Sequence, residues 1–376
     1  MTIPFNVPFS TGQELNYIAE AIQNNKTAGD GPFTKRCQSW MEQQYGFKKC
    51  LLTTSCTDAL ELAALLLNIQ PGDEVILPSY TFVSTANAFA LRGAKLLFAD
   101  STSLNPNIDP EAVRSLITNR TKAIVVVHYA GMACDMKAIM QMANEYGVFV
   151  VEDAAQAIDA YLYDRPLGSF GHLAAFSFHE TKNIQSGEGG MLVVNDEQFI
   201  HQAEILREKG TNRSAFFRGE VDKYGWVAVG SSFLASDIIA AFLYAQLEHL
   251  AAIQAIRCRI WNRYQEAFAN LEEQGLIKTP KGIEGSSING HMYYLVCKNL
   301  NQRNELIAYL KEKGIQAVFH YLSLHNSTYF TTQYQGVSLT NSDFYSDTLV
   351  RLPLYASISN EQQEYIINSV QDFLNN

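Results

Sequence analysis

From residue 47 onward, short apolar runs alternate with longer segments of helical character. The apolar runs predict strands at 50–53, 74–77, 95–99, 123–128 and 148–151. The segments between them predict helices at 57–67, 83–91, 110–117 and 136–146. Short all-apolar strands that alternate with helices are typical of a mostly parallel sheet covered on both faces. We therefore expect an α/β fold whose ligands bind at the carboxyl ends of the strands.

Two further apolar runs, at 174–178 and 191–194, enclose a polar loop that contains one lysine, Lys182. This pattern predicts a strand, a loop and a second strand. A helix is expected at 197–209, followed at 211–226 by a polar and aromatic segment without regular periodicity. Loops of that length in a compact domain are usually functional or mobile.

The pattern changes again in the last third of the chain. The helical stretch 236–271 alters its character near Ala251, where we place a domain boundary. Beyond it we expect strands at 293–297 and 317–321, a helix at 304–313, and a capping box at 359–362 that opens the final helix. The prediction is a large α/β domain over 1–250 and a smaller α+β domain over 251–376.

The first fifty residues are mixed. Residues 12–24 have helical character, and Thr34 is a candidate N-cap for a helix that ends near Tyr45. The glycines at 29 and 31 do not form a dinucleotide-binding fingerprint, because the third glycine and the preceding strand are missing.

Composition places the chain among globular proteins, with 47% apolar and 18% charged residues over 376 positions. The net charge of −10 argues against a nucleic-acid or membrane-surface partner. No apolar run approaches the roughly 20 residues of a spanning helix, and the N-terminus lacks signal-peptide regions. Six scattered cysteines show neither Cys-x-x-Cys nor zinc spacing. We expect reduced thiols, a cytoplasmic location and no metal site.

The segment after the first regular strand contains Ser55, Cys56 and Thr57, at the start of the next helix. Small hydroxyl residues and free amides at a helix N-terminus can bind phosphate. Ordinary N-capping by Ser55 or Thr57 explains the same residues, so both interpretations stay open.

Three residues after later strands are candidate ligands of a planar ring. Phe82 could lie flat on such a ring, or it could be ordinary core packing. Asp153 would pair with a protonated ring nitrogen, or it would act as a helix N-cap. Gln156 could reach a neighbouring phenolic oxygen.

Lys182 is the candidate nucleophile. A lysine held between two buried strands loses hydration, which lowers its pKa and makes the neutral amine able to attack a carbonyl. The alternative is a lysine on a surface loop. Taken together, a phosphate cradle, an aromatic ring, a carboxylate and an amine are the groups that hold pyridoxal 5′-phosphate (PLP).

These residues belong to motifs that resemble the DegT-type nucleotide-sugar aminotransferases of the fold type I PLP superfamily. The motifs are Ser-Cys-Thr at 55–57, Pro-Ser-Tyr-Thr-Phe at 78–82, Val-Glu-Asp-Ala-Ala-Gln at 151–156, and Ser-Phe-His-Glu-Thr-Lys-Asn with Gly-Glu-Gly-Gly within 177–190. The segments 209–224, 230–233 and 317–325 extend the similarity. The resemblance implies fold type I over essentially the whole chain.

It also implies roles for the candidate residues. Lys182 would carry the cofactor and move the proton, Asp153 would pair with the ring nitrogen, and Gln156 would lie near the ring hydroxyl. Phe82 would stack on the ring. The phosphate would be held by Ser55, Cys56, Thr57 and Ser177.

The family completes its phosphate site from a second subunit, commonly with an Asn in an Asn-Tyr-Arg-Met-Thr-Asp motif. Here that motif corresponds to Ser-Phe-Leu-Ala-Ser-Asp at 232–237, so Ser232 would take the position of the Asn. The resemblance thus implies a homodimer with shared active sites, although this departure affects the contact between subunits.

Substrate contacts are candidates only. Arg213 or Lys223 in the 211–226 loop would suit a diphosphate, although the loop could equally be a dimer contact. His320, Tyr321 and His325 follow a predicted strand and could line a sugar pocket, or each histidine could be packed or lie at the surface.

The resemblance implies a reaction in two halves, in which L-glutamate donates its amino group and C4 of a dTDP-4-keto-6-deoxyhexose accepts it. Another nucleotide keto-sugar remains an alternative substrate. Same-fold sugar dehydratases are a rival class, but they typically replace the lysine with histidine. A non-catalytic PLP-binding protein is a second rival. A nicotinamide-dependent dehydrogenase would need a Gly-x-Gly-x-x-Gly that is not present.

Overall fold

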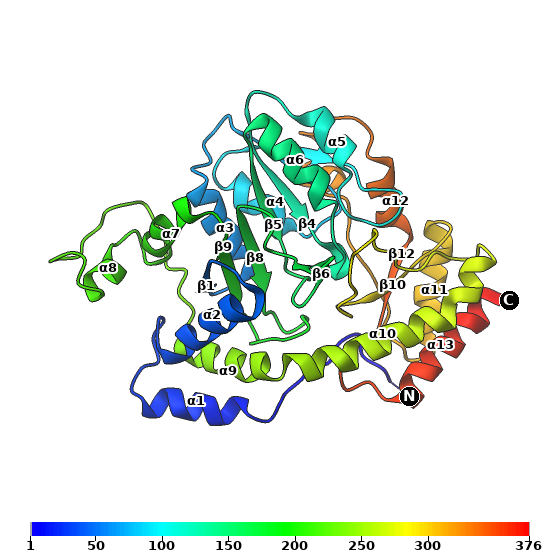
Figure 1. The fold of residues 1–376 in the computed structure, drawn as a ribbon. Helices are drawn as coiled ribbons and strands as arrows, with labels where there is room; N and C mark the ends of the chain where they lie inside the picture. Colours follow the sequence, from blue (N-terminus) through cyan, green and yellow to red (C-terminus); the bar gives the residue numbers. More distant parts are fainter. Residues whose placement is uncertain (1, 376) are drawn as a thin grey trace.

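A seven-stranded sheet forms the centre of the computed structural model, which describes residues 2–375 (Figure 1). Its strand order is β1-β9-β8-β5-β4-β2-β3. The strands are β1 (Lys49–Thr53), β2 (Glu74–Pro78), β3 (Lys95–Ala99), β4 (Thr121–Val127), β5 (Phe149–Asp153), β8 (Leu173–Ser177) and β9 (Gly190–Val194).

Only β9 runs against the other six strands of this sheet. It pairs antiparallel with both β1 and β8, whereas β8, β5, β4, β2 and β3 pair in parallel. The carboxyl ends of six strands therefore meet the amino end of β9 at one edge. The fold is a mostly parallel α/β sheet of fold type I, as the sequence predicts.

Helices cover both faces of this sheet. One face packs against α2 (Pro32–Tyr45), α6 (Met136–Tyr146) and α9 (Asp237–Glu248), and the other packs against α3 (Cys56–Leu66), α4 (Val83–Ala90) and α7 (Ile200–Arg207). Side chains alternate between the faces along each strand, so that Leu52 lies in the first core and Leu51 in the second. The strands are apolar throughout because both of their faces are buried.

The remaining short elements lie around this core. They are α1 (Glu14–Gln23), α5 (Pro110–Leu116), α8 (Arg213–Phe217), the hairpin β6 (Tyr161–Leu162) and β7 (Arg165–Pro166), and the 3₁₀ turns η1 (Tyr129–Gly131), η2 (Glu197–Phe199) and η3 (Leu324–Asn326). The segment with α8 projects from the body, at the left of Figure 1.

The C-terminal third builds a second, antiparallel sheet of order β10-β12-β11. Its apolar residues form a core of their own with the helices at 250–273, 300–312 and 360–375. The elements are α10 (Leu250–Glu273), β10 (Tyr293–Val296), α11 (Leu300–Glu312), β11 (Val318–Phe319), α12 (Thr340–Thr348), β12 (Leu349–Leu352) and α13 (Asn360–Asn375).

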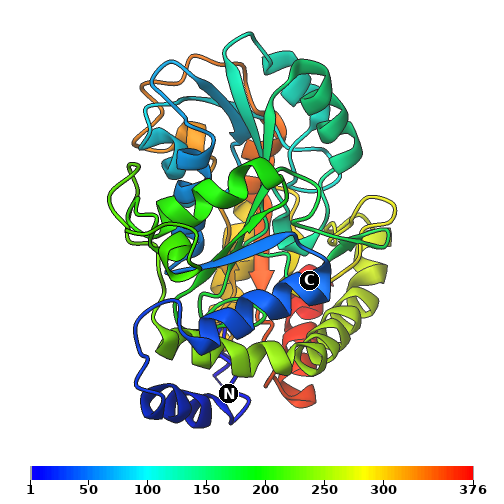
Figure 2. The same ribbon diagram turned by 60° about the vertical axis from the view of Figure 1, so that its left-hand side comes forward.

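Helices α9 and α10 form one path along the base of the molecule, with a 62° bend between them (Figures 1 and 2). We propose that the domain boundary near Ala251 coincides with this bend. The N-terminal segment packs against the C-terminal part of the chain, because Ile3 pairs with Ile315 and its side chain lies in the C-terminal core. Among the described residues no single helix is long and apolar enough to cross a membrane, and only the bent α9–α10 pair reaches that length and composition.

Two local predictions have opposite outcomes. The capping box is confirmed: Gln362 N–H donates to Ser359 Oγ (3.1 Å), and Ser359 N–H donates to Gln362 Oε1 (2.9 Å). The Thr34 N-cap is wrong, because α2 begins at Pro32. The free N–H groups of its first turn, including that of Thr34, donate instead to the buried carboxylate of Asp237.

Candidate active site

A cavity of about 560 Å³ opens where the carboxyl edge of the large sheet faces the C-terminal sheet. Residues that follow β1, β2, β5 and β8 line one side of it, and residues next to β10, β11 and β12 line the other. Ten of the residues predicted from the sequence line this cavity: Ser55, Cys56, Thr57, Phe82, Asp153, Gln156, Ser177, Lys182, His320 and Tyr321.

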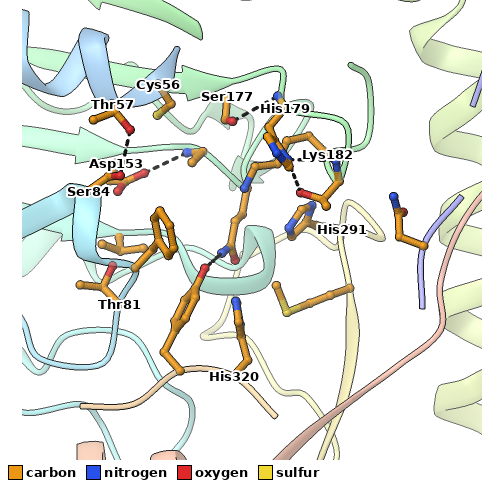
Figure 3. Close-up of a pocket in the computed structure, with 18 of the residues that line it drawn as sticks. Cys56, Thr57, Thr81, Ser84, Asp153, Ser177, His179, Lys182, His291 and His320 are labelled. Atoms are coloured by element: carbon orange, nitrogen blue, oxygen red, sulfur yellow. Dashed lines mark hydrogen bonds between the residues drawn. The ribbon is translucent and has the colours of Figure 1, made fainter. Parts of the chain in front are cut away.

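The N-terminus of α3 forms one end of the cavity. Ser55 is the N-cap, and its Oγ accepts from Asp58 N–H (3.0 Å). The N–H groups of Cys56 and Thr57, within the first turn, have no intrahelical partner. Thr57 Oγ1 donates to Ser84 Oγ (2.8 Å; Figure 3). Capping by Ser55 leaves these two amides free, so it does not exclude an anion at this end of the helix.

Asp153 ends β5 with its carboxylate buried at the cavity wall. Oδ2 accepts from the Thr85 hydroxyl (2.7 Å), and Oδ1 accepts from Ala155 N–H (3.1 Å). Burial raises the pKa of Asp153, while these donors and the Lys182 charge oppose the rise. No helix starts here, since 154–160 form turns, so the N-cap interpretation is wrong.

Lys182 lies in the loop between β8 and β9 and lines the same cavity (Figure 3). Burial lowers the pKa of Lys182, and the nearby Cys56 and Asp153 groups oppose this. Its backbone N–H is fixed by the His179 carbonyl (2.9 Å). Lys182 is therefore a half-buried lysine at the cavity rather than a freely solvated one on a surface loop. A lowered pKa increases the share of the neutral amine, which is the nucleophilic form.

An aromatic pair lines another side of the cavity. Phe82 is 54% exposed although it is apolar, and its ring centroid lies 5.9 Å from that of Tyr321. The core-packing interpretation of Phe82 is therefore wrong, and its ring is available to a planar ligand. Gln156 accepts from Ala130 N–H (2.6 Å), and its amide nitrogen lies 3.4 Å from the Tyr321 hydroxyl.

The two histidines of the 317–325 segment have different surroundings. His320 lines the cavity, contacts the Tyr129 hydroxyl through Nδ1 (3.0 Å), and has its pKa lowered well below the usual value, chiefly by burial. His325 lies outside the cavity lining, with Nδ1 bonded to Ser79 Oγ (2.7 Å). His325 is thus a packed histidine, the alternative that the sequence left open.

Three predicted residues lie away from the cavity. Arg213 pairs with Glu208 (3.3 Å) and its guanidinium lies 5.2 Å from the Phe217 ring centroid. Lys223 and Ser232 are exposed. Within one subunit, none of these three reaches the candidate cofactor site.

The structure also adds residues that the sequence analysis missed. Thr85 holds Asp153, while Phe5, His291 and Arg351 line the cavity. The arginine had a signal in the sequence: it is one charged residue inside the apolar run Leu-Val-Arg-Leu at 349–352. Phe5 had none, since only the tertiary fold brings the N-terminal segment to this site.

The assembled residues fit PLP. The free amides of α3 suit its phosphate, the buried Asp153 suits a ring N–H, and the Lys182 amine suits its carbonyl. Among residues 2–375, no group of three or more His, Cys, Asp or Glu side chains is arranged to hold a metal ion.

Known proteins share both the sequence and the fold. The profile of the DegT/DnrJ/EryC1/StrS aminotransferase family matches residues 9–371. The spore coat polysaccharide biosynthesis protein SpsC of Bacillus subtilis is 34% identical over 99% of this chain and 97% of its own.

Solved structures agree with this similarity. Aminotransferase TlmJ from Streptoalloteichus hindustanus is 28% identical with a TM-score of 0.91, over 100% of this chain and 99% of its own. The putative sugar aminotransferase Spr1654 from Streptococcus pneumoniae, in its PMP form, is 25% identical with a TM-score of 0.90 over the same shares. A PLP form of Spr1654 also matches. The chain is therefore a PLP-dependent sugar aminotransferase, and it belongs to the DegT/DnrJ/EryC1/StrS aminotransferase family.

Proposed function

We propose that the enzyme transfers the amino group of L-glutamate to C4 of a dTDP-4-keto-6-deoxyhexose. The product would be dTDP-4-amino-4,6-dideoxygalactose, a precursor for cell-surface polysaccharide. The observation that best supports this function is the cavity. It combines the Lys182 amine, the Asp153 carboxylate and the N-terminal end of α3 with the His320–Tyr321 segment. The choice of sugar rests on the resemblance of the 209–224 and 317–325 segments to C4 aminotransferases of this family.

The residues have distinct tasks in this proposal. PLP supplies a carbonyl that accepts an amino group and a ring that takes up an electron pair. The amides of Cys56 and Thr57, with the Ser55 and Ser177 hydroxyls, bind the phosphate. Asp153 would accept a hydrogen bond from the ring N–H and stabilise the positive charge of the ring nitrogen.

Two further residues would orient the ring. Phe82 would pack against its face, and the Gln156 amide would hold its hydroxyl. Both side chains line the cavity, and the Gln156 carbonyl is anchored by Ala130 N–H. They would restrict a bound ring to one orientation, with its carbonyl carbon toward the Lys182 side of the cavity.

Lys182 is the proposed general base and acid. Its amine removes a proton from the reacting carbon of L-glutamate, and it returns a proton to C4 of the sugar in the second half-reaction. The same residue serves both halves because the two substrates enter the cavity in turn. Burial keeps its pKa below that of an ordinary lysine, which increases the fraction of free amine near neutral pH.

Three predicted residues that lie outside the cavity fit a shared active site. We propose a homodimer in which Ser232 completes the phosphate site of the partner, while Arg213 and Lys223 reach the nucleotide diphosphate. The projecting α8 segment supports this arrangement, because it leaves three large aromatic side chains exposed: Phe217, Tyr224 and Trp226. We place the enzyme in the cytoplasm, where free thiols such as the six cysteines here persist.

The test is product analysis with a panel of keto-sugars. The enzyme, PLP and L-glutamate are incubated with dTDP-4-keto-6-deoxyglucose, its 3-keto isomer, and a UDP-linked 4-keto-sugar. We expect NMR to show a 4-amino sugar of galacto configuration from the first substrate only. Lys182→Ala should lose at least about 10³-fold in rate, and Lys298→Ala, at an exposed position, should keep full activity. Preferred 3-amination, a gluco product or a preference for UDP would contradict the proposal.

A further inference from the structure

Asn183, the residue after Lys182, is buried in a cluster of amide side chains behind the cavity wall. Its Nδ2 donates to the Asn289 carbonyl (2.8 Å) and to Gln254 Oε1 (2.8 Å). Gln254 Nε2 donates to the same carbonyl (3.2 Å). A backbone carbonyl can only accept, so it fixes both side-chain amides with their nitrogens toward it. Both amide protons of Asn183 are therefore used, and its Oδ1 is left as an acceptor.

The group that meets this oxygen is the imidazole of His291, whose Nδ1 lies 2.7 Å from Asn183 Oδ1. Because Oδ1 carries no proton, Nδ1 must carry the proton of this hydrogen bond. Burial lowers the pKa of His291 well below its usual value. The charges of Lys182, Arg257 and Arg351 act in the same direction. The ring is therefore neutral near neutral pH, and its Nε2 carries a lone pair.

Asn289 fixes the backbone of His291 as well. Its Oδ1 accepts from His291 N–H (3.0 Å). Its Nδ2 donates to the carbonyls of Gln156 (2.8 Å) and Ile158 (3.0 Å), which orients this third amide by fixed acceptors too. The imidazole is thus held at its main chain and at Nδ1, and its Nε2 edge has one direction.

That Nε2 edge belongs to a side chain that lines the cavity. Among residues 2–375, no group donates a hydrogen bond to Nε2. Figure 3 shows His291 beside Lys182, as expected from the contact between His291 and Asn183. The Lys182 charge also acts on His291, which requires that the two groups lie close together. A lone pair without a donor thus lies near an amine that carries protons.

We propose that His291 is a positioning residue for Lys182: its Nε2 accepts a hydrogen bond from the Lys182 amine whenever that amine is not bonded to the cofactor. The proposal rests on the aminotransferase function given above. A lysine amine turns freely on its flexible stem, whereas proton transfer needs its lone pair directed at the reacting carbon. An acceptor that holds one N–H bond restricts this direction. Because the ring is neutral, it orients the amine without exchanging a proton with it.

This role predicts a particular pattern of damage. The Lys182 amine takes a proton from the carbon that bears the reacting nitrogen, in either half-reaction run from its amine. Loss of Nε2 should therefore slow both half-reactions by a similar factor. A residue that binds one substrate would instead affect the half-reaction of that substrate alone.

Two variants separate the nitrogens of the ring. His291→Asn keeps a donor near the Nδ1 position and lacks Nε2, whereas His291→Gln can present an amide oxygen near the Nε2 position. The PLP-loaded enzymes are mixed with L-glutamate, or with the dTDP-4-amino sugar that runs the second half-reaction backwards. Conversion is followed by cofactor absorption. For His291→Asn we expect about a tenfold lower kcat with both amines, which corresponds to one lost hydrogen bond.

Two kinetic signatures separate this role from a structural one. In His291→Asn the KM values should stay within about twofold of wild type, because substrate binding is unchanged. The isotope effect with α-deuterated L-glutamate should rise, because proton transfer limits the rate more strongly. His291→Gln should lie closer to wild type in both respects.

His172→Asn is the matched control, because His172 is also fixed through Nδ1, here by Val150 N–H (2.9 Å), but lies outside the cavity. It should change neither rate. A loss with only one amine in His291→Asn would assign Nε2 to that substrate and overturn the proposal. Wild-type rates, an unchanged isotope effect, or equal losses in the Asn and Gln variants would also overturn it.

The apoenzyme gives a second readout that needs no turnover. Nitrogen NMR of apoenzyme with isotope-labelled histidine should show His291 protonated at Nδ1 and not at Nε2, with His291→Asn assigning the signals. Lys182→Ala should shift the Nε2 signal and leave Nδ1 in place, while Lys298→Ala should shift neither. A proton on Nε2, or an Nε2 signal that Lys182→Ala leaves unchanged, would overturn the proposal. Failure of wild type to convert with L-glutamate would contradict the proposed function instead, and these spectra would still decide the role of His291.

Discussion

Gly190 lies so close to Ser55 that a Cβ on the glycine would come within 2.2 Å of the Ser55 carbonyl carbon and 2.4 Å of the Cys56 nitrogen. Gly190 is the first residue of β9 and pairs with Thr53 and Ser177. The absence of a side chain thus lets β9 support the N-terminus of α3. The end of the helix that we assign to the phosphate is positioned by this backbone contact.

Gly190→Ala is therefore expected to damage the phosphate site. The added methyl must displace backbone, which costs about 1–3 kcal/mol in well-packed regions. We predict at least about a tenfold weaker affinity for PLP and a lower Tm, measured by titration of the apoenzyme and by thermal unfolding.

Gly225→Ala is the control, because a Cβ there meets nothing within 4 Å. It should leave both the PLP affinity and the Tm near the wild-type values. If Gly190→Ala bound PLP as tightly as this control, the supporting role of Gly190 would be wrong.

The strand ends were predictable because each strand is buried on both faces. Continuous apolar runs revealed β2, β4 and β5, and the residues that follow such strands must gather at one edge. The same reasoning predicts that Asp153 and Lys182 share one site, and both line the cavity. Their neighbouring motifs identified the cofactor through the family resemblance.

The opposite wall of the cavity was not predictable in the same way. Arg351 reaches it because β12 pairs between β10 and β11, a register set by contacts distant in sequence. Phe5 reaches it because Ile3 pairs with Ile315 at the other end of the chain. Thr34 is a second example of a contact that the local sequence does not predict. The first N–H groups of its helix donate to Asp237, which is distant in sequence, and not to the Thr34 hydroxyl.

Thr85 should control the protonation of Asp153. Its hydroxyl donates to the carboxylate and lowers the pKa that burial raises. Thr85→Val removes this donor, so the pKa of Asp153 rises and the acid limb of kcat/KM moves to higher pH. A hydrogen bond to a charged group contributes about 1.5–3 kcal/mol, so the displacement of the acid limb should be measurable.

Thr85→Ser retains the hydroxyl and provides the matched comparison. Its pH profile should overlay that of wild type. Equal shifts in the Val and Ser variants would show that the side-chain shape of Thr85 matters rather than its hydrogen bond.

The amine of Lys182 should titrate below an ordinary lysine in the apoenzyme, because burial disfavours the ammonium form. The anionic Asp153 opposes that shift, so Asp153→Asn removes an attraction and lowers the pKa of Lys182 further. The pH dependence of labelling by an amine reagent, followed by peptide mass spectrometry, gives both values. A higher pKa in Asp153→Asn would contradict this electrostatic account.

The central claim is that Lys182 and Asp153 act with PLP to move an amino group from L-glutamate to a sugar. The most direct measurement is the absorption spectrum of the PLP-loaded enzyme before and after L-glutamate, and again after dTDP-4-keto-6-deoxyglucose. We predict that L-glutamate removes the visible band of the cofactor, that the keto-sugar restores it, and that Lys182→Ala does neither. A band that L-glutamate leaves unchanged, or a Lys182→Ala variant that responds as fast as wild type, would contradict the account.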